Sequence, residues 1–69
     1  MGDEHIMRIR YRSGDTVYII ESVRFIRQCV VLRFGGGLYT LRFADSPGGV
    51  RLRENRLFPT EEAAKRMIG

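Results

Sequence analysis

The stretch GGGLYTLRFADSPGG, residues 35–49, indicates how this chain folds. A glycine triplet and a Ser-Pro-Gly-Gly run enclose a short segment in which Tyr39, Leu41 and Phe43 occupy every second position. Alternation with a period of two places these apolar side chains on one face of a strand. Glycine, proline and serine clusters are typical of turns. We therefore predict a strand over 38–43 with a tight turn at each end.

Runs rich in β-branched and aromatic residues lie on both sides of this segment, which favours further strands. We predict them over Ile6–Arg12, Thr16–Glu21, Val23–Phe34 and Val50–Arg53, the first two separated by a turn at Ser13-Gly14-Asp15. In the strand over 50–53, Val50 and Leu52 are expected to face inward. The Thr16–Glu21 run is apolar on both faces, as a strand central to a small barrel would be.

The long Val23–Phe34 run is harder to interpret, because both of its faces are partly apolar. We expect one face to point into the core, and it holds Ile26, Val30, Leu32 and Phe34. A polar Gln28 on that face indicates a bend or bulge, or else a strand that begins near Gln28. The opposite face needs a cover or a partner, and it holds Phe25, Arg27, Cys29, Val31 and Arg33.

The C-terminal residues Glu61–Ile68 are predicted to form a short helix. Thr60 is a suitable N-cap, acidic residues open the helix, and basic residues lie near its end, where the helix dipole favours each charge. Two turns of helix are unstable in isolation. Ala64, Met67 and Ile68 are therefore expected to pack against Phe25, Cys29 and Val31, or against the open end of a barrel.

Together these elements predict one domain, residues 1–69, of the mainly β class. We expect a small SH3-like barrel of four to five antiparallel strands, over about 6–59, with a short C-terminal helix over about 61–68. Closure into a barrel would remove the exposed sheet edges that invite aggregation.

The composition limits the functions that this domain can have. The single cysteine, Cys29, and the single histidine, His5, rule out an internal disulfide and a zinc cage built from these residue types, and no other metal or cofactor is expected. The carboxylates are scattered, and Asp15 and Asp45 are interpreted as turn-stabilising residues. We therefore do not expect an enzyme. No apolar run is long enough for a membrane span, and no secretion signal is present, so a cytoplasmic protein is expected.

The sequence from Gly14 to Pro59 resembles Tudor domains and related SH3-like barrels of the KOW type. The resemblance rests on Gly14-Asp15-Thr16-Val17, on Tyr39-Thr40-Leu41-Arg42-Phe43-Ala44-Asp45, and on the closing positions Val50, Leu57 and Pro59. It implies the barrel fold but no binding residues. The Tyr-Gly that supplies part of the methyl-reading cage in Tudor domains is replaced here by Ser46-Pro47, and the chain has no tryptophan.

The ending Arg56-Leu57-Phe58-Pro59-Thr60-Glu61-Glu62-Ala63-Ala64 is similar to that of short proteins of bacterial mobile elements. This second resemblance implies a bacterial, cytoplasmic protein. It carries no functional residues.

The distribution of charge gives the leading functional hypothesis. The formal net charge is +4, and eleven of the twelve basic residues are arginines, which suit phosphate recognition and stack on bases. We predict a nucleic-acid-binding face formed by Arg33, Arg42, Arg51 and Arg53, to which Arg27 and the N-terminal Arg8, Arg10 and Arg12 could contribute. Tyr18 or Phe25 could stack a base.

Two other interpretations remain open at this point. The basic face could be merely solvated and partly neutralised by Glu21 and Glu54, since a GC-rich genome also favours arginine. Alternatively, the domain could be a protein-interaction or self-association module with an exposed apolar patch around Phe25, Cys29 and Val31, buried in a homodimer or against another protein.

Overall fold

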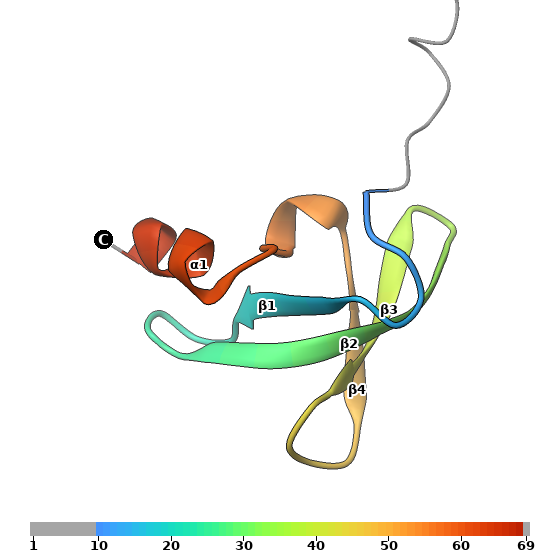
Figure 1. The fold of residues 1–69 in the computed structure, drawn as a ribbon, viewed down its shortest axis with the longest axis horizontal. Helices are drawn as coiled ribbons and strands as arrows, with labels where there is room; N and C mark the ends of the chain where they lie inside the picture. The colour runs from blue at the N-terminus through green and yellow to red at the C-terminus, as the bar shows by residue number, and fades with distance from the viewer. Residues whose placement is uncertain (1–9, 69) are drawn as a thin grey trace, which may run out of the picture.

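The computed structural model describes residues 10–68, which form one antiparallel sheet and a short C-terminal helix (Figure 1). The elements in chain order are β1 (Thr16–Ile20), β2 (Ile26–Gly35), β3 (Leu38–Phe43), β4 (Gly49–Leu52), the 3-10 helix η2 (Glu54–Arg56) and α1 (Glu61–Ile68). The mainly β class with a terminal helix is confirmed. Most of the strand predicted over Ile6–Arg12 lies outside the described residues, and positions 10–12 are not part of a strand.

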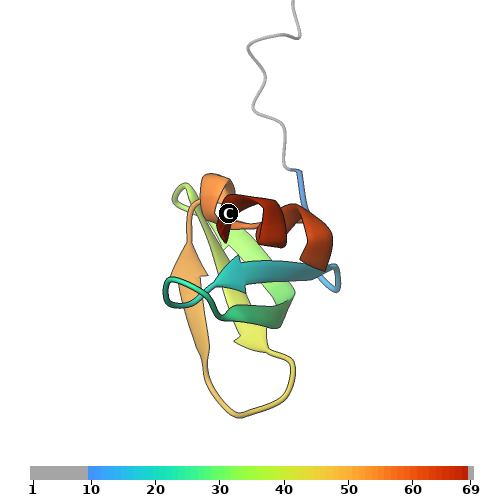
Figure 2. The same cartoon turned by 90° about the vertical axis from the view of Figure 1, so that its left-hand side faces the viewer.

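The four strands follow one another in space in the order β1-β2-β3-β4. The long β2 pairs with β1 through its first half and with β3 through its second half, so it connects the two ends of the sheet. Within residues 10–68 β1 and β4 do not pair, and the sheet is not closed. An isolated bridge brings Phe58 to the free edge of β1, where Tyr18 and Phe58 exchange two backbone hydrogen bonds of 2.8 Å. Helix α1, which follows this bridge in the chain, lies beside β1 (Figure 2).

The core lies on the inner face of this bent sheet. Its buried members are Tyr11, Val17, Ile19, Cys29, Val31, Tyr39, Leu41 and Leu57, and Phe34, Phe43, Val50 and Leu52 pack against them. The inward alternation predicted for β3 and β4 is confirmed. Full burial of a side chain such as Leu41 stabilises the fold by about 1.5–3 kcal/mol.

The predicted orientation of β2 is wrong over most of its length. Cys29 and Val31 point into the core, whereas Leu32, expected inside, is 44% exposed. The register explains the difference: Val31 pairs with Leu41 and Arg33 with Thr40, so Leu32 is the extra residue of a β-bulge. The bulge reverses the alternation, and Phe34 returns to the inner face.

The bulge thus lies at Leu32 and not at Gln28, and β2 begins at Ile26. A single period of two, extended back from the inward Phe34, assigned the wrong residues to the core. The Phe34 ring does pack against Tyr39, with the ring centroids 4.6 Å apart.

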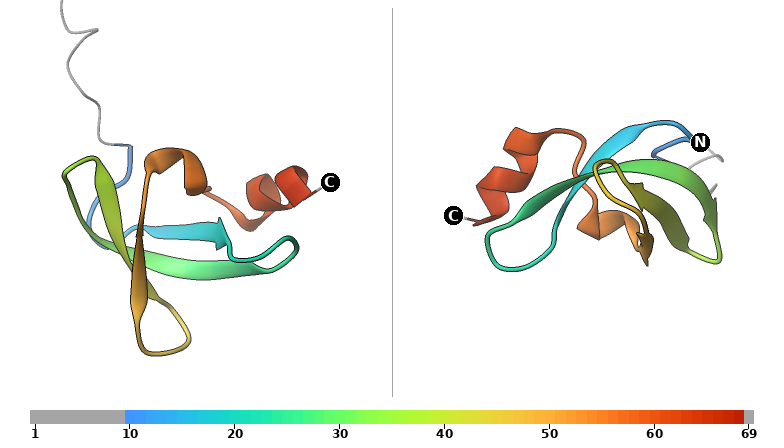
Figure 3. Two further views of the ribbon diagram at one scale, coloured as in Figure 1. Left: turned by 180° about the vertical axis from the view of Figure 1, so that it is seen from behind. Right: turned by 90° about the horizontal axis from the view of Figure 1, so that it is seen from below.

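Helix α1 has the predicted bounds, and the Thr60 hydroxyl accepts a hydrogen bond of 3.0 Å from the Ala63 N–H. The helix contacts β1 and β2 and lies along their hairpin, away from the β2–β3 turn (Figures 1 and 3). Ala64 is fully buried, as expected, but Met67 is exposed. The helix does not cover Cys29 and Val31, because those side chains face the core. No helix within residues 10–68 has the length and apolar character required to cross a bilayer.

One local and two long-range hydrogen-bond contacts hold the chain before β1. The Asp15 carboxylate accepts the Arg12 N–H at 2.8 Å, as predicted for a turn-stabilising residue. The buried Tyr39 hydroxyl accepts the N–H groups of Arg10 and Tyr11 at 3.0 and 3.3 Å. Asp45 was also expected to stabilise a turn through backbone N–H groups, but its carboxylate lies 4.0 Å from the Arg27 guanidinium instead.

Candidate nucleic-acid interface

Four of the predicted site residues lie on the outer side of the sheet, and we call them the outer arginine face: Arg33, Arg42, Arg51 and Arg53. Arg33 of β2 and Arg51 of β4 both pair with Thr40 of β3, so their side chains stand in one row across three strands. Arg42 is the diagonal neighbour of Arg51, and such neighbours are about 7–8 Å apart. Arg53 continues the β4 line toward η2.

Arg33 owes its place on this face to the bulge. Arg33 and Val31 are two residues apart, and in a regular strand their side chains would share a face. Val31 is buried in the core, so a regular β2 would direct Arg33 inward as well. Because Leu32 is inserted between them, both Leu32 and Arg33 stand opposite Thr40 and face outward.

The outer arginine face forms no ion pairs inside the described residues. All four arginines are exposed, and no ion pair within residues 10–68 includes any of them. The two carboxylates expected to neutralise the face pair with other arginines: Glu54 lies 3.7 Å from Arg10, and Glu21 lies 2.8 Å from Arg27. Direct pairing of Glu21 or Glu54 with this face is therefore not observed in the described residues.

A groove of about 630 Å³ opens between these arginines. It is lined by Leu32, Thr40, Leu41, Arg42, Gly48, Gly49, Val50 and Arg51. Gly49 has no alternative at its position, since a Cβ there would collide with the Leu41 carbonyl oxygen. Gly48 and Gly49 thus contribute only backbone to the groove, and the exposed Leu32 contributes an apolar side chain.

A second hollow of about 330 Å³ lies beyond Arg51, toward η2. Its lining includes Arg51 and Arg53 together with Arg56, which sequence reasoning did not include in the site. Arg56 belongs to the 3-10 helix, and no periodic signal in the sequence predicted that element. Leu32 was also missed, because the sequence analysis assigned its side chain to the core.

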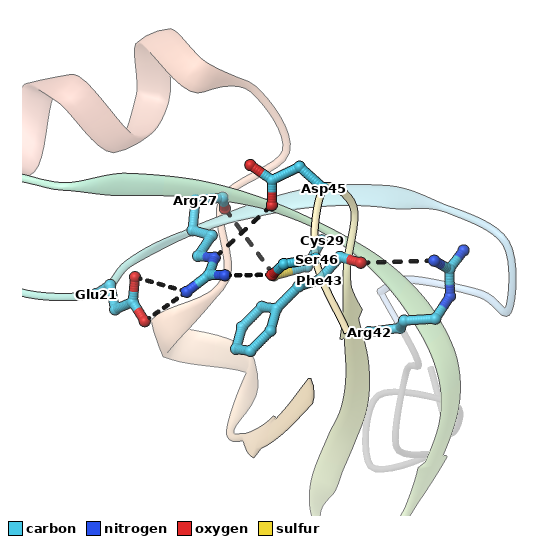
Figure 4. A network of polar contacts seen from close by, with 7 residues as sticks. All are labelled: Glu21, Arg27, Cys29, Arg42, Phe43, Asp45 and Ser46. Carbon is cyan, nitrogen blue, oxygen red and sulfur yellow. Dashed lines mark hydrogen bonds and ion pairs between the residues drawn. The ribbon is translucent and has the colours of Figure 1, made fainter. Parts of the chain in front are cut away.

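Arg27 does not belong to the outer arginine face. Its guanidinium carbon lies 3.8 Å from the centre of the Phe43 ring, and Nη1 donates to both carboxylate oxygens of Glu21 at 3.0 and 2.8 Å. Nη2 donates to the Ser46 hydroxyl at 2.5 Å, and Nε lies 4.0 Å from Asp45. In Figure 4 the Arg27 and Arg42 guanidinium groups lie apart, and Arg42 Nη1 donates to the Phe43 carbonyl oxygen at 3.5 Å. Arg27 therefore joins the β1–β2 and β3–β4 turns.

The apolar patch predicted for a protein partner is not formed. Phe25 is 69% exposed, but Cys29 and Val31 are core residues with almost no exposed surface. Burial raises the pKa of the Cys29 thiol, partly offset by the nearby Arg27 charge. Cys29 thus has the properties of a structural thiol.

The two aromatic residues considered for base stacking lie elsewhere. Tyr18 and Phe25 line a hollow of about 390 Å³ together with the carboxylate residues Glu21, Asp45 and Glu61. Arg27 also lines this hollow and pairs with Glu21, but the three carboxylates still outnumber it and disfavour a phosphate there. We therefore exclude Tyr18 and Phe25 from the candidate interface.

Within residues 10–68 no three His, Cys, Asp or Glu side chains are grouped so that they could hold a metal ion. No family model, no curated protein and no solved structure matches the chain. The resemblances to Tudor-like barrels and to mobile-element proteins therefore stay predictions.

Proposed function

We propose that this protein is a non-catalytic, cytoplasmic module that binds nucleic acid through the outer arginine face. One observation carries the proposal: Arg33, Arg42 and Arg51 stand on one exposed face of three adjacent strands, with no acidic partner among residues 10–68. Guanidinium groups donate in a planar fork that matches phosphate oxygens. The Arg53 and Arg56 side chains extend this basic surface toward η2.

We further propose that the architecture is an SH3-like barrel left partly open. The pair of backbone hydrogen bonds between Tyr18 and Phe58 supports this, because it brings the C-terminal segment to the edge of β1, on the side opposite β2. In such an arrangement the core is enclosed and the outer face of β3 and β4 stays available to a ligand.

Recognition on this face is expected to be electrostatic and largely independent of sequence. Helix α1 contacts β1 and β2 and is short, so it is not placed to read a major groove beside the arginines. Each neutralised phosphate contributes about −0.7 to −0.9 to the slope of log K against log salt. Four contacts therefore give a slope of about −3.

Fluorescence anisotropy with a labelled oligonucleotide at salt concentrations from about 50 to 200 mM tests the proposal. Arg42→Glu and Arg51→Glu should each lower the affinity about tenfold or more and reduce the salt slope. Arg24→Glu is the matched control, because Arg24 is exposed in the β1–β2 turn and carries the same charge. Absence of binding at about 50 mM salt, or an affinity indifferent to salt, would refute the proposal.

A protein-interaction module is the second candidate, and exposed apolar side chains favour it. Val23 and Met67 are 81% and 67% exposed, and both line a hollow of about 400 Å³ between the β1–β2 turn and α1. Sedimentation velocity over a range of concentrations would detect self-association at this place. A monomer at all concentrations, unchanged by Val23→Ser, would argue against a homodimer.

A further inference from the structure

We infer that the outer arginine face takes single-stranded nucleic acid, with one unstacked base seated in the groove between Leu32 and the Gly48–Gly49 turn. This inference rests on the proposed function and narrows its ligand class. It starts from the shape and chemistry of the groove, whereas the proposed function starts from the charge around it.

The groove suits a flat ring better than it suits a phosphate. Its volume of about 630 Å³ is within the range of small-ligand sites, about 300–1,000 Å³. Leu32 presents an apolar side chain that the bulge directs outward, and Gly48 and Gly49 line the same groove with backbone alone. A phosphate would gain nothing from Leu32, but a base can pack a face against it.

The charges are arranged around the groove in a way that fits the rest of a nucleotide. Arg42 and Arg51 both line it, on adjacent strands and on the same face. The phosphates on either side of a seated base can therefore each meet a guanidinium. Thr40 pairs with Arg51 and precedes Arg42 by two positions on β3, and its hydroxyl can donate or accept a hydrogen bond, which tolerates more than one base.

A duplex would leave the groove unused. Its bases are stacked and paired inside the helix, and extruding one of them costs a few kcal/mol. The surface offered to a duplex by β3 and β4 consists of short side chains and arginines on a sheet, and α1 lies along the other hairpin (Figure 3). A single strand has no such penalty, because its bases are already free to turn out.

The test compares three fluorescent ligands of equal length at the same salt concentration: a thymidine strand, its duplex with an adenosine strand, and an abasic strand that keeps only sugars and phosphates. The thymidine strand should bind about tenfold more tightly than the other two. Leu32→Ala should weaken binding of the thymidine strand about fivefold and leave the abasic strand unaffected. Val23→Ala is the matched control, since Val23 is an exposed apolar residue away from the groove.

The outcomes separate the two proposals. If none of the three ligands binds, the proposed function itself fails. If all three bind equally and Leu32→Ala changes nothing, nucleic-acid binding stands but the seated base is refuted. Leu32→Asn, which keeps the branched shape of the side chain and replaces its apolar end with an amide, provides a second variant should Leu32→Ala disturb β2. Circular dichroism and thermal unfolding of each variant show whether its fold is kept.

Discussion

Arg27 and Arg33 are six positions apart on the same strand, yet they face opposite sides of the sheet and have opposite surroundings. Arg27 lies on the inner side, stacked on Phe43 and paired with Glu21. Arg33 lies on the outer side, exposed and without a carboxylate partner in the described part of the chain. The bulge at Leu32 separates the two environments. Residue type and spacing alone therefore did not decide which arginine is structural.

The β3–β4 turn links the two regions. Its first part is held by Arg27, through the Ser46 hydroxyl and the Asp45 carboxylate. Its last part, Gly48 and Gly49, forms a wall of the groove. A change in this turn should therefore affect both the structural arginine cluster and the candidate interface, whereas a change in either arginine should affect mainly one of them.

Gly49→Ala should have the largest effect, because it disturbs both regions at once. The new Cβ would meet the Leu41 carbonyl oxygen, a backbone atom that cannot move without shifting β3. We expect a loss of about 3 kcal/mol in the free energy of unfolding, measured by urea denaturation. Gly35→Ala is the matched control, since a Cβ at Gly35 meets no atom within 4 Å, and it should change stability little. Equal stability of the two variants would contradict the close approach of Gly49 to the Leu41 carbonyl oxygen.

Single replacements of Arg27 and Arg33 by leucine should distinguish the structural cluster from the candidate interface. Arg27→Leu removes the contacts that join two turns and should destabilise the fold by about 1–2 kcal/mol in urea denaturation, and it should lower nucleic-acid affinity less than Arg33→Leu does. Arg33→Leu should leave stability within about 0.5 kcal/mol and lower affinity several-fold. If Arg33→Leu destabilised more than Arg27→Leu, the division between a structural and a binding arginine would be wrong.

Much of the fold could be predicted from the sequence, because several elements carry local signals. The alternation of Tyr39 and Leu41, the Asp15 turn and the Thr60 cap each depend on residues close together in the chain, and each is found as expected. The outward positions of Arg42 and Arg51 were also predicted, because alternation is regular on β3 and β4.

What could not be predicted depends on contacts between distant residues or on a change of period. Nothing in the residue type of Leu32 marks a bulge, so the faces of β2 were assigned in reverse. The partners of Arg27 come from two different turns, six and nineteen positions away, and only the paired hairpins bring them together. Arg56 enters the basic surface through a 3-10 turn, for which one short segment gives no periodic signal.

The smallest expected effect concerns the thiol that lies behind Arg27. Burial raises the pKa of Cys29, and Arg27 acts in the opposite direction. A group whose pKa is higher in the folded state contributes stability that is fully present below its unfolded pKa, which is about 8.5 for cysteine. This contribution is lost as the pH rises from the unfolded pKa through the folded pKa. Urea denaturation from pH 7 to 10 should show falling stability. Cys29→Ala should reduce this dependence without removing it, because burial raises the pKa of Tyr11 as well.

Thiol labelling tests the burial of Cys29 directly. At neutral pH the buried Cys29 should react with a thiol reagent only when the chain unfolds. Arg27→Leu removes the contacts that join the two turns and destabilises the fold, so Cys29 should be labelled faster in this variant. Labelling no faster than in the unsubstituted protein would argue against Arg27 as the residue that joins the turns.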